Sequence, residues 1–149
     1  MRRFLLLAGV LLALGLDVQA ATSQVVKVLP HLLDQQKRST LHPSLYERDA
    51  YQKHLRDHPE LCSGLRFDVH WKVAKDAFPG VTLRIEARGT KPVKAVVLET
   101  PLEPQPWYKR WTSLQIDGEA YRQFGELVAW RATLWRGDTL LAEQKSFLW

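Results

Sequence analysis

The stretch GLRFDVHWKV at residues 64–73 decides the fold, because apolar and polar side chains alternate along it with a period of two. Its odd-numbered positions from 65 on are Leu, Phe, Val, Trp and Val, and Arg, Asp, His and Lys stand between them. This period is typical of a β-strand with one face in the core and the other in water. The stretch VTLRIEAR at residues 81–88 repeats the pattern, and Phe78-Pro79-Gly80 between the two is a turn sequence. We therefore predict that the two stretches form a β-hairpin.

Short apolar or alternating stretches bounded by turn residues predict five further strands. These strands span residues 24–29, 93–100, 111–116, 127–135 and 140–147, and Pro30 is expected to end the first. Residues 119–125 are predicted to be a short connection. The last three residues, Phe147 to Trp149, are expected to complete the core.

One helix is predicted at about residues 45–57, within a helical segment at 44–58. Ser44 and Glu47 fit a capping box, in which each side chain satisfies a backbone N–H of the first turn. Pro59 ends the helix, because the residue before a proline is disfavoured in helical geometry. The strands of the last hairpin are apolar on both faces, so we expect the helix to cover one of those faces.

Seven short strands with hairpin turns between them predict a mainly β fold, a two-sheet antiparallel sandwich with one short helix packed on it. An immunoglobulin-like topology is our hypothesis for the connections, although the Cys–Trp–Cys framework of antibody domains is absent. Residues 21–149 are long enough to form a single β-sandwich domain around one core.

Residues 1–20 have the pattern of a secretion signal that is cleaved after Ala20. An apolar run of 13 residues follows Arg2 and Arg3. A membrane-spanning helix needs about 20 apolar residues, so this run is too short to be an anchor. We therefore expect an exported protein, periplasmic or extracellular, with no membrane span after cleavage of the signal.

The charge balance argues against nucleic acid as a partner. The chain has 21 Lys and Arg and 16 Asp and Glu, and without Arg2, Arg3 and Asp17 of the signal 19 basic and 15 acidic residues remain. Basic and acidic residues alternate along the chain, whereas a nucleic-acid footprint needs clustered cations. We expect a protein or a surface polymer as the partner.

The segment Trp107 to Trp111 is the best candidate for a binding site. Trp107, Tyr108 and Trp111 lie there with Lys109 and Arg110 between them, after the Pro-rich stretch that begins at residue 101. Exposed aromatic rings beside polar groups can stack on sugar rings or anchor a protein interface. The alternative is that both tryptophans fold back into the core, because a chain with six tryptophans must bury most of them.

His54 and His58 are weak candidates for a metal site, because their spacing on the predicted helix lets both imidazoles point one way. Leu55 stands where a zinc metalloprotease would have Glu, and histidines in a last helical turn also suit the negative end of the helix dipole. Cys62 is the only cysteine, so no disulfide can form within the chain. Its thiol is either a small buried hydrophobic group or one half of a bridge to another chain. No cofactor is predicted.

The outer faces of the two alternating stretches carry charged groups that we expect to face each other across the hairpin. In that pairing His70 lies opposite Glu86, and Asp68 lies opposite Arg88. A histidine beside carboxylates can transfer protons, but opposite charges across two strands also serve simply to pair them.

Together these patterns predict an exported, non-catalytic binding or interaction domain. The sequence has no Gly-rich phosphate loop, no paired cysteine motif and no nucleophile elbow. One alternative is a small extracytoplasmic enzyme that uses surface histidine and carboxylate groups. Another is a structural or assembly component that docks through an unpaired sheet edge.

Overall fold

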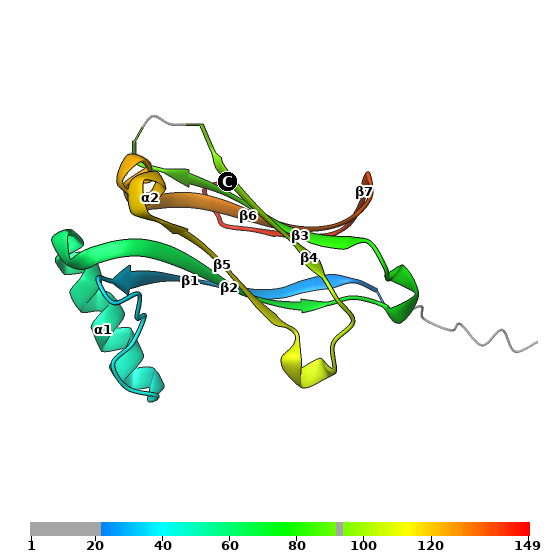
Figure 1. Ribbon diagram of the computed structural model, residues 1–149, viewed down its shortest axis with the longest axis horizontal. Coiled ribbons are helices and arrows are strands. Elements are labelled where there is room, and N and C mark those ends of the chain that lie inside the picture. The colour runs from blue at the N-terminus through cyan, green and yellow to red at the C-terminus, as the bar shows by residue number, and fades with distance from the viewer. Residues whose placement is uncertain (1–21, 92–93) are drawn as a thin grey trace, which may run out of the picture.

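Two antiparallel sheets packed face to face make up the fold (Figure 1). The computed structural model describes residues 22–91 and 94–149, so the predicted secretion signal at 1–20 lies outside the described residues. The first sheet has the order β1-β2-β5, formed by β1 (Gln24–Asp34), β2 (Cys62–Lys72) and β5 (Trp111–Asp117). The second has the order β4-β3-β6-β7, formed by β4 (Val96–Leu102), β3 (Val81–Gly89), β6 (Leu127–Arg136) and β7 (Thr139–Lys145). The predicted mainly β, two-sheet arrangement is confirmed, and the immunoglobulin-like topology stays a prediction.

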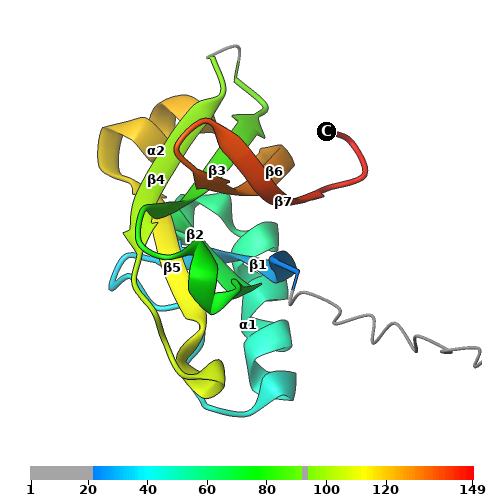
Figure 2. The same cartoon turned by 90° about the vertical axis from the view of Figure 1, so that its right-hand side faces the viewer.

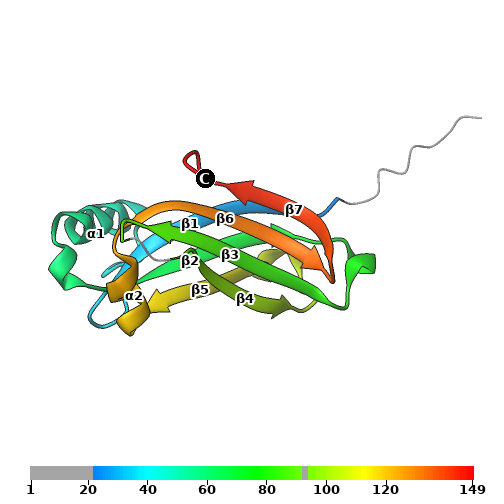
Figure 3. The same cartoon turned by 90° about the horizontal axis from the view of Figure 1, so that it is seen from above.

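Two α-helices lie at the same end of the sandwich (Figures 1 and 3). They are α1 (Leu45–Asp57) and α2 (Gly118–Phe124). Three single turns of 3₁₀-helix add to them: η1 (Pro59–Leu61), η2 (Lys75–Ala77) and η3 (Trp107–Lys109). None of the helices within 22–91 and 94–149 has the length and apolar character needed to cross a membrane.

The core lies between the sheets and is built on the period-two pattern of β2 and β3. Phe67 and Val69 of β2 and Leu83 and Ile85 of β3 are all completely buried. Trp71 is only 2 % exposed. The apolar side chains that alternate in the sequence therefore point inward, and the polar residues between them point outward, as predicted.

The predicted hairpin between residues 64–73 and 81–88 is wrong, because β2 and β3 belong to different sheets (Figure 1). β2 pairs with β1 and β5, whereas β3 pairs with β4 and β6. The segment between them contains the 3₁₀ turn η2 and crosses from one sheet to the other. A period of two specifies which face of a strand is buried but not which strand lies beside it, so each apolar face is here covered by the opposite sheet.

The first strand does not end at Pro30, as predicted, but continues to Asp34. Pro30 lies opposite Phe67 in the pairing with β2. A proline has no backbone N–H to donate, and a central strand must donate hydrogen bonds to a neighbour on each side. β1 is an edge strand that pairs only with β2 in its sheet, so it has fewer donors to supply. The proline is therefore tolerated in the middle of this strand.

Helix α1 has the predicted bounds but not the predicted cap or packing partner. Ser44 makes no side-chain hydrogen bond at the N-cap, and its backbone N–H donates to His42 Nδ1 instead. The helix packs against β1 on the outer side of the first sheet, not on the last hairpin (Figure 2). Leu55 is completely buried there, and Gln52 both accepts from the backbone N–H of Leu32 (2.8 Å) and donates to its carbonyl oxygen (2.9 Å).

The outer side of the second sheet is covered by its own long side chains rather than by a helix. The guanidinium of Arg84 lies 5.3 Å from the ring centroid of Trp135, and that of Arg88 lies 4.1 Å from the centroid of Trp149. These contacts are within cation–π range. The predicted role of the last residues in the core is wrong: Phe147 is fully exposed, and β7 ends at Lys145.

The predicted connection at 119–125 is largely the helix α2, which is held against β3 by a close backbone approach. A Cβ atom added to Gly89 would lie 2.0 Å from the carbonyl oxygen of Phe124. Phe124 is itself only 2 % exposed, so it has little room to move. Residue 89 must therefore be glycine because Phe124 leaves no space for a Cβ atom, and not because of the φ angle at this position.

We expect Gly89→Ala to lower the free energy of unfolding by about 3 kcal/mol, because the added methyl group overpacks the contact with Phe124. Gly137→Ala is the matched control: Gly137 has a φ of +56° but no atom within 4 Å of an added Cβ. The control should lose only about 1 to 2 kcal/mol, from backbone strain. Urea unfolding of both variants measures the difference, and equal losses would refute the proposed clash.

Candidate functional site

Three large aromatic side chains of the predicted binding segment stand in water. Trp107 is 76 % exposed, Tyr108 is 61 % exposed and Trp111 is 45 % exposed. The alternative that these tryptophans fold back into the core is therefore wrong. That the segment binds a ligand stays a prediction.

The segment forms a turn that is held by one backbone and one side-chain hydrogen bond. The N–H of Lys109 donates to the carbonyl oxygen of Pro106 at 2.9 Å, and Arg110 Nε donates to the carbonyl oxygen of Gln105 at 3.0 Å. These bonds close η3, and the backbone N–H of Trp71 donates to the carbonyl oxygen of Arg110 at 3.0 Å, which ties the turn to β2. In Figure 1 this turn, just before β5, projects from the first sheet on the side away from the second sheet.

Trp111 is the first residue of β5, directly after the turn. Its side chain lies on the outer face of the first sheet. It lies opposite His70 of β2, and the two rings stack with centroids 4.9 Å apart and planes 10° apart. Trp107 and Tyr108 meet edge to face at 5.8 Å. We call these four residues, His70, Trp107, Tyr108 and Trp111, the aromatic face.

Beside the aromatic face, Asp68 lies at the centre of a hydrogen-bonded cluster. His31 Nδ1 donates to its Oδ2 at 3.0 Å, Ser113 Oγ donates to its Oδ1 at 2.5 Å, and Arg66 contacts both oxygens. Burial alone would raise the pKa of Asp68, but the hydrogen bonds from His31, Ser113 and Arg66 lower it to about 2. The carboxylate is thus charged at neutral pH and both of its oxygens accept hydrogen bonds. This arrangement suits holding the side chains of His31, Ser113 and Arg66 in place better than it suits proton transfer.

The predicted pairs His70–Glu86 and Asp68–Arg88 are wrong, because their members lie on different sheets. Glu86 instead lies opposite Arg131 of β6 and pairs with it at 3.5 Å. The histidine and carboxylate groups that sequence reasoning placed together therefore form no common site.

The two histidines of α1 lie together at its C-terminal end. The rings of His54 and His58 have centroids 4.4 Å apart, and His58 Nδ1 lies 3.0 Å from the carbonyl oxygen of His54. The Nδ1 of His58 is thus in contact with a carbonyl oxygen at the C-terminal end of the helix, where the helix dipole favours a hydrogen-bond donor. Within residues 22–91 and 94–149, no group of three or more His, Cys, Asp or Glu residues is placed to hold a metal ion.

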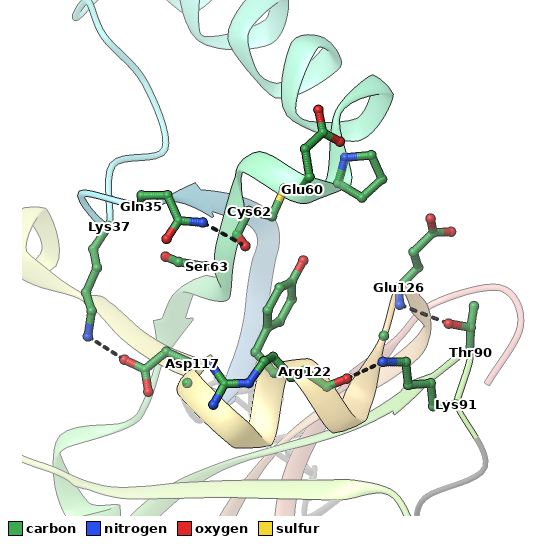
Figure 4. A pocket seen from close by; sticks show the side chains of 14 residues that line it. Gln35, Lys37, Glu60, Cys62, Ser63, Thr90, Lys91, Asp117, Arg122 and Glu126 are labelled. Atoms are coloured by element: carbon green, nitrogen blue, oxygen red, sulfur yellow. Dashed lines mark hydrogen bonds and ion pairs between the residues drawn. The ribbon is translucent and has the colours of Figure 1, made fainter.

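A cleft of about 860 Å³ between η1, the start of β2 and α2 was not foreseen from the sequence (Figure 4). Part of its charged lining is paired: Lys37 Nζ lies 2.6 Å from Asp117 Oδ2, and Lys91 donates to the carbonyl oxygen of Arg122. A more apolar cavity of about 320 Å³ adjoins it under α1. The lining residues come from positions 35 to 126, so no local motif could have indicated the cleft.

Cys62 and Tyr121 form the wall that the two cavities share. Burial raises the pKa of the Cys62 thiol, and its Sγ donates to the carbonyl oxygen of Leu55 at 3.3 Å. Burial also raises the pKa of Tyr121 to about 12, with a further contribution from Cys62. Both groups are therefore neutral at pH 7, and the thiol is a weak nucleophile.

We expect Asp68→Asn to lower the free energy of unfolding at pH 7 by about 2 kcal/mol, because the pKa falls from 3.8 to about 2 on folding. A lowered pKa stabilises the folded state above about pH 4, and the effect is lost as the pH falls toward 2. Urea unfolding at pH 7 and pH 2 should therefore show the variant and the wild type converging in acid. Asp138→Asn, at an exposed hairpin tip, is the control. A loss that is the same at both pH values would rule out the charge of Asp68 as its cause.

The chain matches no protein-family model, no curated protein and no solved structure to which it was compared. Function must therefore be inferred from the geometry of its own residues. The Asp68 cluster is satisfied by internal hydrogen bonds and ion pairs, and so are Lys37 and Asp117 of the cleft. The aromatic face differs from both, because its largest side chains remain in contact with water.

Proposed function

We propose that this chain is an exported, non-catalytic binding domain whose aromatic face binds the sugar rings of a surface polymer. The observation that carries the proposal is the exposure of Trp107, Tyr108 and Trp111, at 76 %, 61 % and 45 %. Aromatic side chains of this size supply much of the contact area in binding sites. A ligand that covers them removes apolar surface from water, which favours binding.

The composition around the aromatic face favours a sugar over a protein. A sugar ring has an apolar C–H face, which stacks on an aromatic ring, and hydroxyl groups at its edge, which need polar neighbours. Ser113 and Gln115, the next outward residues of β5, are polar and exposed, and each keeps an oxygen that can accept a hydrogen bond while its side chain donates to Asp68 or Asp117. A protein interface has a more continuous apolar centre. Most exposed aliphatic side chains lie on other parts of the molecule, and only Val26 belongs to the first sheet: the others are Leu41 before α1, Leu45 in α1, Leu61 in η1, Val97 on β4, Val128 on β6, Leu140 on β7 and Leu148 after it.

Neither alternative function has comparable support. The carboxylate of Asp68 is occupied by three hydrogen-bonding side chains, which leaves it poorly placed for acid–base chemistry. Docking through a sheet edge needs free backbone N–H groups. Pro30 and Pro101 interrupt the donors of β1 and β4, two of the four edge strands, and so disfavour strand addition there, whereas β5 and β7 contain no proline.

Export is the first part of the proposal to test. A bacterium that expresses the whole chain should yield a periplasmic or secreted protein whose N-terminus is Ala21, because residues 1–20 carry the basic and apolar regions of a secretion signal. Leu11→Arg interrupts the apolar run and should leave the uncleaved chain in the cytoplasm. Mass spectrometry of the cell fractions measures both. A wild-type chain that keeps Met1 in the cytoplasm would refute export.

Binding is tested by affinity electrophoresis through gels that contain soluble polysaccharides. The wild type should be retarded, and Trp107→Ala and Trp111→Ala should each weaken binding at least about tenfold, because each removes a stacking surface. Trp149→Ala is the matched control, since Trp149 lies over Arg88 of the second sheet. The proposal fails if both aromatic-face variants are retarded as much as the wild type.

A further inference from the structure

We propose that the polymer bound by the aromatic face is an anionic polysaccharide, one whose sugar rings carry carboxylate groups. This inference rests on the proposed function and adds the charge of the ligand to it. It comes from the cations that lie around the aromatic face.

Two lysines lie beside His70 on the outer face of the first sheet. Lys27 of β1 is directly opposite His70 in the strand pairing, so the two share a face. Lys72 is two residues further along β2, and alternation places it on the same face. Both lysines are exposed. Lys27, His70 and Trp111 therefore form one row across the three strands.

Two further cations belong to the turn that carries Trp107. The ammonium of Lys109 lies 5.9 Å from the ring centroid of Tyr108. Arg110 bonds through Nε to the carbonyl oxygen of Gln105, which places its guanidinium beside the same turn. The aromatic rings are thus flanked by cations from the sheet and from the turn.

No carboxylate of the described residues neutralises these four cations. Among residues 22–91 and 94–149, none of Lys27, Lys72, Lys109 and Arg110 lies within ion-pair distance of a carboxylate. Other cations of the molecule are paired, as in Lys37–Asp117, Lys53–Asp57, Arg84–Glu99 and Arg131–Glu143. Still others, such as Lys94 and Lys145, form no ion pair with a residue that the structure describes, so what favours an anionic ligand here is the position of the four cations around the rings. The carboxylate nearest to His70 along β2, Asp68, is already held by Arg66. The aromatic face therefore has a positive surround that an anionic ligand complements.

A polymer of uronic acids matches both features. The C–H face of each sugar stacks on an indole ring, and the carboxylate at the ring edge reaches a lysine beside it. A single-stranded nucleic acid also combines stacking rings with negative charge. The secretion signal predicted at residues 1–20 takes the chain away from the cytoplasm, however, and toward polymers outside it.

The test measures binding of the purified chain, residues 21–149, to polygalacturonate, alginate and hyaluronate at low salt. Fully methyl-esterified polygalacturonate and dextran serve as neutral probes, and an oligo-dT strand serves as the nucleic acid. The variant Lys27→Gln/Lys72→Gln should bind the anionic polymers about tenfold more weakly than the wild type, because two ionic contacts are lost. The control Lys94→Gln/Lys145→Gln removes the same charge from exposed lysines next to β4 and in β7 and should bind as the wild type does.

The outcomes separate this inference from the proposed function. Preference for the carboxylate polymers over the methyl ester, weakened by salt and by the Lys27/Lys72 variant, supports it. Equal binding of neutral and anionic polymers that is lost in Trp107→Ala overturns the inference but leaves the proposed function intact. If no polysaccharide binds, both fail. Tighter binding of oligo-dT than of every polysaccharide overturns the inference in favour of a nucleic acid.

Discussion

Burial of the apolar faces of β2 and β3 is the constraint on which the rest of the molecule depends. Phe67 and Val69 on one strand and Leu83 and Ile85 on the other are completely removed from water, and they can be buried together only if the two sheets face each other. Once the odd-numbered residues of β2 point inward, the even-numbered ones must point outward, because successive side chains of a strand alternate. The outward position of His70 is thus a consequence of the core.

The outer side of the first sheet is divided between a covered and an open part. Leu33 of β1 is completely buried and His31 is nearly so, at the end where α1 packs on the sheet. At the other end Lys27 stays exposed, and Trp111 reaches the surface beside the turn η3. The same sheet therefore stabilises the fold through one half of its outer side and presents the aromatic face on the other.

Part of the candidate site was visible in the sequence and part was not. The run from Trp107 to Trp111 stands out because it places three aromatic residues directly after a Pro-rich stretch, which disfavours a strand up to the beginning of β5 at Trp111. His70 could not be connected with it, since the stacking on Trp111 depends on the pairing of β2 with β5, strands more than 40 residues apart. The cleft beside Tyr121 was missed for the same reason.

What the sequence determined by itself is which residues of β2 and β3 are buried, about where most of the strands and α1 lie, and which segment has the aromatic residues. These are local properties, set by a period of two or 3.6 residues and by proline. Only the tertiary structure decided that β2 and β3 lie in different sheets, that α1 covers the first sheet, and that His70 stacks on Trp111. Any apolar surface of fitting shape can bury an apolar strand face. Which sheet or helix covers that face therefore depends on all contacts of the fold together.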